Sequence, residues 1–151
     1  MTVASQLLWS LAPPLVTGTD DVVLAGMLEP CCDMGGDALD NALNGDVLHL
    51  AVFDAMGHGL AAAGVAAFVL SAHRHGRAGG AGLADAYAQI DAAVTEQHHG
   101  SRFVTAVLAE LDLPSGRLRW VSAGHPAPLV LRDGRLVKTL DTARRSYPTE
   151  S

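Results

Sequence analysis

The chain has 151 residues, of which 49% are hydrophobic and 17% are charged, and its formal net charge is −6. This length suits one domain with a buried core, and this composition is typical of a globular chain rather than a disordered one. The acidic balance, with no basic cluster beyond Arg144-Arg145, argues against nucleic acid or an anionic membrane as the main partner.

The two cysteines, Cys31 and Cys32, are neighbours in the chain. Adjacent cysteines cannot form an unstrained bridge with each other, and no C-x-x-C spacing is present, so two free thiols in a reducing compartment are expected. The N-terminus lacks the features of a secretory signal, and the uncharged run at residues 59–72 is too short to span a bilayer. The sequence therefore predicts a cytoplasmic protein.

The first third of the chain predicts a short helix and a β-hairpin. Residues 5–9 favour a helix, Pro13-Pro14 ends it, and residues 17–20 have loop composition. A short apolar strand is expected at residues 22–28. Two further strands, at residues 37–43 and 47–53, flank Asn44-Gly45, which is a strong signal for a type I′ hairpin turn. The second of them is apolar enough to predict burial on both faces.

Two consecutive helices are expected next. Residues 59–75 are rich in alanine and too long for a strand, and residues 77–82 form a glycine-rich break. Residues 83–98 are amphipathic, because apolar side chains recur at helical spacing at Leu83, Tyr87, Ile90 and Val94.

The last third predicts an antiparallel meander followed by a polar tail at residues 141–151. Strands are expected at 103–113, 117–122, 129–132 and 135–140, with turns at 114–116 and at Asp133-Gly134. Hairpins and helices that are segregated along the chain indicate an α+β fold with antiparallel sheet. We expect this sheet to stack on a second one, with the two helices over one outer face.

Asp54 follows an apolar run and precedes a glycine-flanked turn and a helix. It could be a ligand of Mg²⁺ or Mn²⁺ together with the Ala55 carbonyl, because hard cations prefer oxygen ligands. It could equally accept hydrogen bonds from turn amides and cap the helix. The spacing alone does not separate these two interpretations.

Asp37 and Asp40 follow Gly35-Gly36, and two glycines would let the backbone approach a ligand closely. Taken alone, a turn aspartate and a solvent-facing strand aspartate are the simpler interpretation, because Gly and Asp dominate turns. Asp37 and Asp54, however, flank one predicted hairpin whose open ends are adjacent. Their carboxylates are therefore expected to meet at one end of the sheet.

The histidines and glycines give weaker signals. His58 could be a general acid, but a turn residue is the favoured interpretation, as it is for His125 in Ala123-Gly124-His125-Pro126. The turn Gly57-His58-Gly59 before a helix could bind a phosphate on its free amides, although it matches no nucleotide-binding pattern. The remaining histidines of the two helices are expected to be solvated: His73, His75, His98 and His99.

In these residues the sequence resembles the bacterial stage II sporulation protein E type (SpoIIE-like) phosphatases of the metal-dependent PPM, or protein phosphatase 2C-like, superfamily. The resemblance covers about residues 8–140. It rests on five segments in family order: Gly35-Gly36-Asp37-Ala38-Leu39-Asp40, Asp54-Ala55-Met56-Gly57-His58-Gly59, Phe103-Val104-Thr105-Ala106, Ser115-Gly116-Arg117-Leu118 and Ala123-Gly124-His125-Pro126.

The resemblance implies an αββα sandwich of antiparallel sheets with helices on the outer faces. It implies a protein serine/threonine phosphatase that uses metal-activated water and two Mn²⁺ or Mg²⁺ ions. By position, Asp54 would bridge the ions, Asp37 would bind one of them, and Ala55 would offer its carbonyl. The implied partner is a phosphorylated anti-anti-sigma protein of the STAS type.

Three departures from the family qualify this expectation. Ala38-Leu39 replaces the usual aromatic pair, and Met56 stands where eukaryotic relatives have a histidine. The later strands and carboxylate ligands of the family have no counterpart up to Ser151, so residues 1–140 are expected to form a C-terminally truncated domain. Such a domain would bind one ion, or bind metal weakly, and would expose a sheet edge that allows a homodimer. The alternative function is a catalytically inactive, phosphatase-like module that binds partners.

Overall fold

The computed structural model describes residues 2–29 and 35–141. The adjacent cysteines Cys31 and Cys32, and the tail beyond Asp141 with Arg144-Arg145, lie outside the described residues. The described elements, in chain order, are α1 (Val3–Leu11), β1 (Val16–Gly18), β2 (Val23–Ala25), β3 (Gly35–Asn44), β4 (Val47–His58), α2 (Gly59–Ala78), α3 (Leu83–His98), β5 (Val104–Asp112), β6 (Arg117–Ala123), β7 (Leu129–Arg132) and β8 (Arg135–Thr139).

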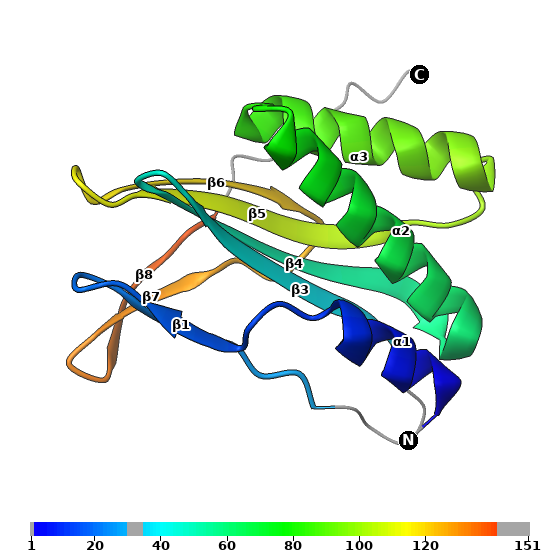
Figure 1. Ribbon diagram of the computed structural model, residues 1–151, viewed down its shortest axis with the longest axis horizontal. Helices are drawn as coiled ribbons and strands as arrows, with labels where there is room; N and C mark the ends of the chain where they lie inside the picture. The colour runs from blue at the N-terminus through cyan, green and yellow to red at the C-terminus, as the bar shows by residue number, and fades with distance from the viewer. Residues whose placement is uncertain (1, 30–34, 142–151) are drawn as a thin grey trace, which may run out of the picture.

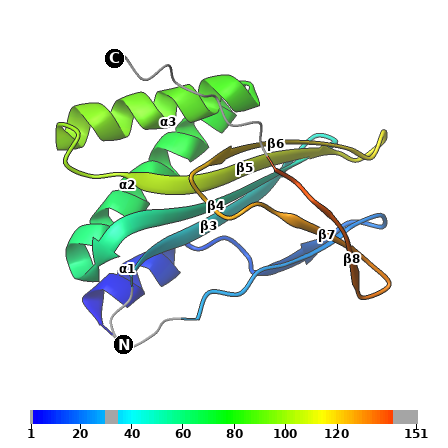
Figure 2. The same cartoon turned by 180° about the vertical axis from the view of Figure 1, so that it is seen from behind.

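The central layer is an antiparallel sheet with the strand order β3-β4-β5-β6. Helices α2 and α3 cover one face of this sheet (Figure 1). The hairpins β1–β2 and β7–β8 lie on its other side, as the view from behind also shows (Figure 2). The described residues thus form an α+β fold with antiparallel sheets, and the second β layer consists of two separate hairpins.

The hairpin β3–β4 follows from the Asn44-Gly45 signal. Asn44 is opposite Val47, and Gly45 has a φ of 58°, which is the left-handed conformation that the predicted turn requires. Residues of β4 then alternate between the two faces: Phe53 is fully buried, whereas Val52 is 43% exposed. The expected burial of residues 47–53 on both faces is therefore wrong, because the two hairpins of the second layer leave Val52 partly uncovered.

The hydrophobic core lies between the sheet and the helices. Small residues of α2 let the helix approach the sheet closely, and Ala62, Ala63 and Ala66 are all fully buried. Phe53 from β4 and Val69 from α2 are also fully buried in this cluster. The predicted helices at residues 59–75 and 83–98 are both present, and the first is three residues longer.

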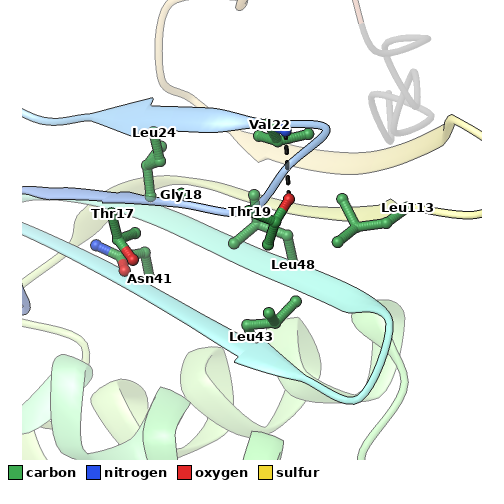
Figure 3. Close-up of a pocket in the computed structure, with 9 residues that line it drawn as sticks. All are labelled: Thr17, Gly18, Thr19, Val22, Leu24, Asn41, Leu43, Leu48 and Leu113. Atoms are coloured by element: carbon green, nitrogen blue, oxygen red, sulfur yellow. Dashed lines mark hydrogen bonds between the residues drawn. The ribbon is translucent and has the colours of Figure 1, made fainter.

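One hairpin was missed by the sequence patterns. Residues 17–20 were expected to be a loop, but β1 pairs with β2, and the Thr19 hydroxyl accepts hydrogen bonds from two amides of the tight turn. The hairpin lies over the turn end of β3–β4, where it borders a pocket of about 60 Å³ (Figure 3). The pocket is lined mainly by aliphatic side chains and contains no carboxylate, so it is separate from the acidic residues described below.

Asp40 is buried on the helix side of the sheet and is only 4% exposed. It accepts hydrogen bonds from Arg74 Nε at 3.0 Å and Nη2 at 2.8 Å, and its other oxygen lies 3.2 Å from His73 Nδ1. The expectations of a solvent-facing Asp40 and a solvated His73 are therefore wrong. Because successive strand residues alternate between faces, Asp40 points away from the face that carries Asp37.

The Asp40 network predicts a loss of stability in acid. Burial by itself raises the pKa of Asp40, but hydrogen bonds and positive charge from His73 and Arg74 hold that pKa below its ordinary value of 3.8. A lowered folded-state pKa stabilises the fold above 3.8, and this stabilisation is lost as the pH falls through the folded-state value. We expect the free energy of unfolding, measured with urea, to fall more steeply below pH 3.8 for the wild type than for Asp40→Asn. Parallel pH dependences of the two proteins would contradict the role of this carboxylate.

No helix within residues 2–29 and 35–141 combines the length and the apolar character that are needed to cross a bilayer.

Candidate metal and phosphate site

Two carboxylates lie side by side on neighbouring strands. Asp37 of β3 is directly opposite Asp54 of β4, and both residues are exposed. Adjacent strands are about 4.8 Å apart, and paired residues project from the same face of a sheet. The structure thus brings together the two aspartates that the sequence singles out, on the face away from the helices.

The strand does not end at Asp54, contrary to the sequence expectation. β4 continues to His58, which pairs with Gly35, while Gly36 pairs with Ala55. Two residues of β4, Met56 and Gly57, are therefore extra and form a bulge in the ladder. A bulge bends its strand, and bulges are common next to functional sites. Here the bulge follows the acidic pair directly.

Gly36 sets the distance between the two strands at the bulge. A Cβ atom at this position would lie 2.4 Å from the Ala55 carbonyl oxygen and 2.6 Å from its Cβ. The glycine therefore allows β3 to approach β4, whereas the sequence suggested close approach to a ligand. Ala55 itself is 1% exposed, and its carbonyl oxygen lies beside the Gly36 Cα.

Substitution of this glycine tests the close contact. We expect Gly36→Ala to lower the free energy of unfolding by about 2 kcal/mol, because the new methyl group must displace the Ala55 backbone. The neighbouring Gly35→Ala is a matched control, since its Cβ would have its nearest contact at 3.9 Å. Chemical denaturation of both variants measures the difference, and equal losses would contradict the proposed contact.

The turn expected at Gly57-His58-Gly59 is not present: Gly57 and His58 belong to β4 and Gly59 begins α2, so the strand passes directly into the helix. Gly57 and Gly59 have φ values of 98° and 72°, which favour glycine, and His58 is the exposed N-cap residue of α2. Its side chain makes no capping hydrogen bond. Arg102, two residues before β5, has its Nη1 3.5 Å from the Met56 carbonyl oxygen and so supports the bulge.

His125 extends the site on the side of β5. Its Nδ1 lies 2.8 Å from the hydroxyl of Thr105, and Thr105 is opposite Asp54 in the sheet. The sequence interpretation of His125 as a turn residue is thus incomplete, and the sequence patterns predict no site role for Thr105. Both residues stand in segments that resemble the SpoIIE-like pattern, but only the strand register reveals that they adjoin the acidic pair.

The carboxylates repel each other. Partial burial and the negative charge of Asp54 raise the pKa of Asp37, and His125 acts in the opposite direction. Like charges held close together favour the binding of a cation that neutralises them. The residues present therefore fit a divalent metal ion.

The ligand set that the chain offers is small. Among residues 2–29 and 35–141, no group of three or more His, Cys, Asp or Glu side chains is placed to hold a metal ion. Mg²⁺ is commonly held by one or two carboxylates with water and substrate phosphate completing its octahedron. Asp37 and Asp54 match that pattern. A metal ion held by these two carboxylates would keep coordination positions open for a phosphate, which a closed structural site would not.

Sequence comparison places the chain in a family. The profile of the family described as Stage II sporulation protein E (SpoIIE) matches residues 44–147, which is more than half of the chain. The chain belongs to the SpoIIE family. This result confirms the resemblance seen in the sequence motifs.

Several solved structures share the fold. The RsbU and RsbW domains of Rv1364c from Mycobacterium tuberculosis match with 37% identity and a TM-score of 0.59, over 63% of this chain and 27% of that one. A Stage II Sporulation E family protein from Thermanaerovibrio acidaminovorans matches with 28% identity and a TM-score of 0.54, over 66% and 50%. A bacterial stressosome structure has the same fold, at 22% identity and a TM-score of 0.57, over 70% and 55%.

These matches confirm the α+β fold with antiparallel sheets and helices. The SpoIIE-family chain described here spans between about a quarter and just over half of the length of these three structures.

Proposed function

We propose that this chain is a metal-dependent protein phosphatase domain that hydrolyses phosphoserine or phosphothreonine. The observation that supports it best is the pairing of Asp37 with Asp54 on one face of the sheet. Two adjacent carboxylates fit divalent cations, and membership of the SpoIIE family indicates phosphatase chemistry.

We assign Asp54 the role of bridging ligand that the family resemblance implies, and its place opposite Asp37 on β3 is compatible with that role. Asp37 would bind one ion, and the Ala55 carbonyl is the further ligand that the family resemblance implies. Bound Mn²⁺ or Mg²⁺ would supply an activated water and positive charge for phosphoryl transfer. The chain's own contribution is to hold the two carboxylates in register and to orient the substrate.

The amides of Gly57, His58 and Gly59 provide a candidate contact for phosphate oxygens, because they lie where β4 passes into the N-terminus of α2. The bulge, which includes Gly57, follows the acidic pair directly and so places this junction beside it. We assign no general-acid role to His58.

The proposed substrate is a phosphorylated anti-anti-sigma protein of the STAS type in the cytoplasm. The M. tuberculosis relative carries RsbU and RsbW domains, which supports a circuit in which a phosphatase domain works beside partner regulators. The family resemblance supplies the identity of the phosphorylated partner.

The test is phosphate release by the purified 151-residue chain from a phosphorylated STAS-type protein and from p-nitrophenyl phosphate. We expect release with Mn²⁺ or Mg²⁺ and none with EDTA, and we expect calorimetry to detect binding of Mn²⁺. An unrelated phosphoprotein serves as the control for substrate choice. A chain that binds the STAS-type partner but releases no phosphate with either metal would support the inactive, partner-binding module instead.

A further inference from the structure

The loop after β6 returns a histidine to the acidic end of the sheet. Gly124 forms a parallel bridge with Ala106 of β5 and has a φ of 65°, so the chain turns sharply there. The Ser122 hydroxyl then donates to the His125 carbonyl oxygen at 3.1 Å. These contacts hold the His125 backbone over the end of β5.

The side chain of His125 is held as firmly as its backbone. The 2.8 Å contact between Nδ1 and the Thr105 hydroxyl occupies one ring nitrogen. Within the described part of the chain, the other nitrogen, Nε2, makes no hydrogen bond. His125 is only half-buried, so part of its side chain is open to an approaching ligand.

This surface is next to the paired carboxylates. Asp37, Asp54 and Thr105 are successive partners across three strands, so the row is about 10 Å wide. The His125 ring lies against Thr105, with Nδ1 2.8 Å from its hydroxyl, and Thr105 is the residue opposite Asp54. A phosphorylated side chain that reaches metal ions at the acidic pair would therefore come close to Nε2.

We infer that His125 Nε2–H donates a hydrogen bond to a phosphoryl oxygen of the substrate and that Thr105 is the positioning residue that orients the ring. Two carboxylates offer acceptors only, so the substrate's own anionic oxygens need donors from elsewhere in the site. A hydrogen bond to a charged oxygen is among the stronger ones in proteins. This inference rests on the proposed phosphatase function.

Paired substitutions separate the two ring nitrogens. His125→Gln places its side-chain NH₂ near the position of Nε2, whereas His125→Asn retains a polar group near Nδ1 and loses the outer donor. We expect the Asn variant to bind a phosphoserine peptide about tenfold more weakly and the Gln variant to recover most of the affinity. Thr105→Val should also weaken binding, and Thr105→Ser, which keeps the hydroxyl, should restore it.

The measurements combine binding, kinetics and spectroscopy. Calorimetry in Mg²⁺ compares the phosphoserine peptide with its unphosphorylated form, and the histidine ring signals are followed by NMR during titration with the phosphoserine peptide. We expect the Nε2 signal of His125 to shift in the wild type and to shift less in Thr105→Val. The exposed His75→Asn is the control variant and should match the wild type.

The outcomes also separate this inference from the function on which it rests. The role of Nε2 would be overturned if His125→Asn bound the peptide as tightly as the wild type. It would also be overturned if the Asn and Gln variants lost equal affinity with unchanged melting temperatures. Neither result would contradict the phosphatase proposal. A wild type that neither hydrolyses nor binds the phosphoserine peptide in Mg²⁺ would overturn the phosphatase proposal and this inference with it.

Discussion

Asp54→Asn is expected to reduce metal-dependent phosphate release by about 10³-fold. The substitution keeps the shape of the side chain but removes one of the two negative charges that face each other across β3 and β4. Charge stabilisation by a metal ion is worth several kcal/mol in the transition state, and about 4 kcal/mol corresponds to a thousandfold change in rate. The measurement is the initial rate in Mn²⁺, together with calorimetric titration of Mn²⁺.

Asp46→Asn is the matched control for this experiment. Asp46 is an exposed aspartate at the turn end of the same hairpin, so its substitution makes the same change in net charge away from the acidic pair. We expect its rate to stay close to that of the wild type. Retained activity in Asp54→Asn, or a similar loss of activity in both variants, would contradict the assignment of Asp54 as a metal ligand.

The largest expected effect on stability is that of Phe53→Ala. Phe53 is fully buried between β4 and α2, and large-to-small substitutions of buried aromatic residues cost about 4 kcal/mol through lost burial and the remaining cavity. Val52 is the adjacent residue on the other face of β4 and is 43% exposed. Val52→Ala should therefore cost less than about 1 kcal/mol.

Urea denaturation of the two variants measures this difference between the faces of one strand. The wild type must unfold in a single cooperative transition for the comparison to hold. A Val52→Ala variant as unstable as Phe53→Ala would mean that the second β layer contributes as much packing as the helices do, contrary to the exposure of Val52.

Local patterns predicted most of the elements because each element has its own signal. The Asn44-Gly45 turn fixed the main hairpin, and the apolar spacing from Leu83 to Val94 placed α3 at its observed bounds. The missed hairpin β1–β2 has strands of three residues each, which are too short for a clear alternation. It also depends on packing over the main sheet, which local sequence does not encode.

The candidate site was only partly predictable for the same reason. Asp37 and Asp54 flank one hairpin, so sequence separation alone indicated that they would meet. His125 and Thr105 join them through pairing of β4 with β5 and through the turn at Gly124, which are contacts between distant parts of the chain. Asp40 was misplaced because its burial depends on His73 and Arg74 of a helix that lies more than thirty residues later.

The continuous ladder from Asn44 back to Asp37 makes the length of a remote turn critical for the acidic pair. Seven residue pairs, or roughly 23 Å, separate the hairpin turn from the carboxylates. A single residue inserted at Gly45 that shifted the ladder by one position would leave Asp37 opposite Phe53 or Ala55, with one of each pair directed into the core. An insertion at this exposed turn that shifts the register should therefore impair the site as much as a substitution of the carboxylates themselves.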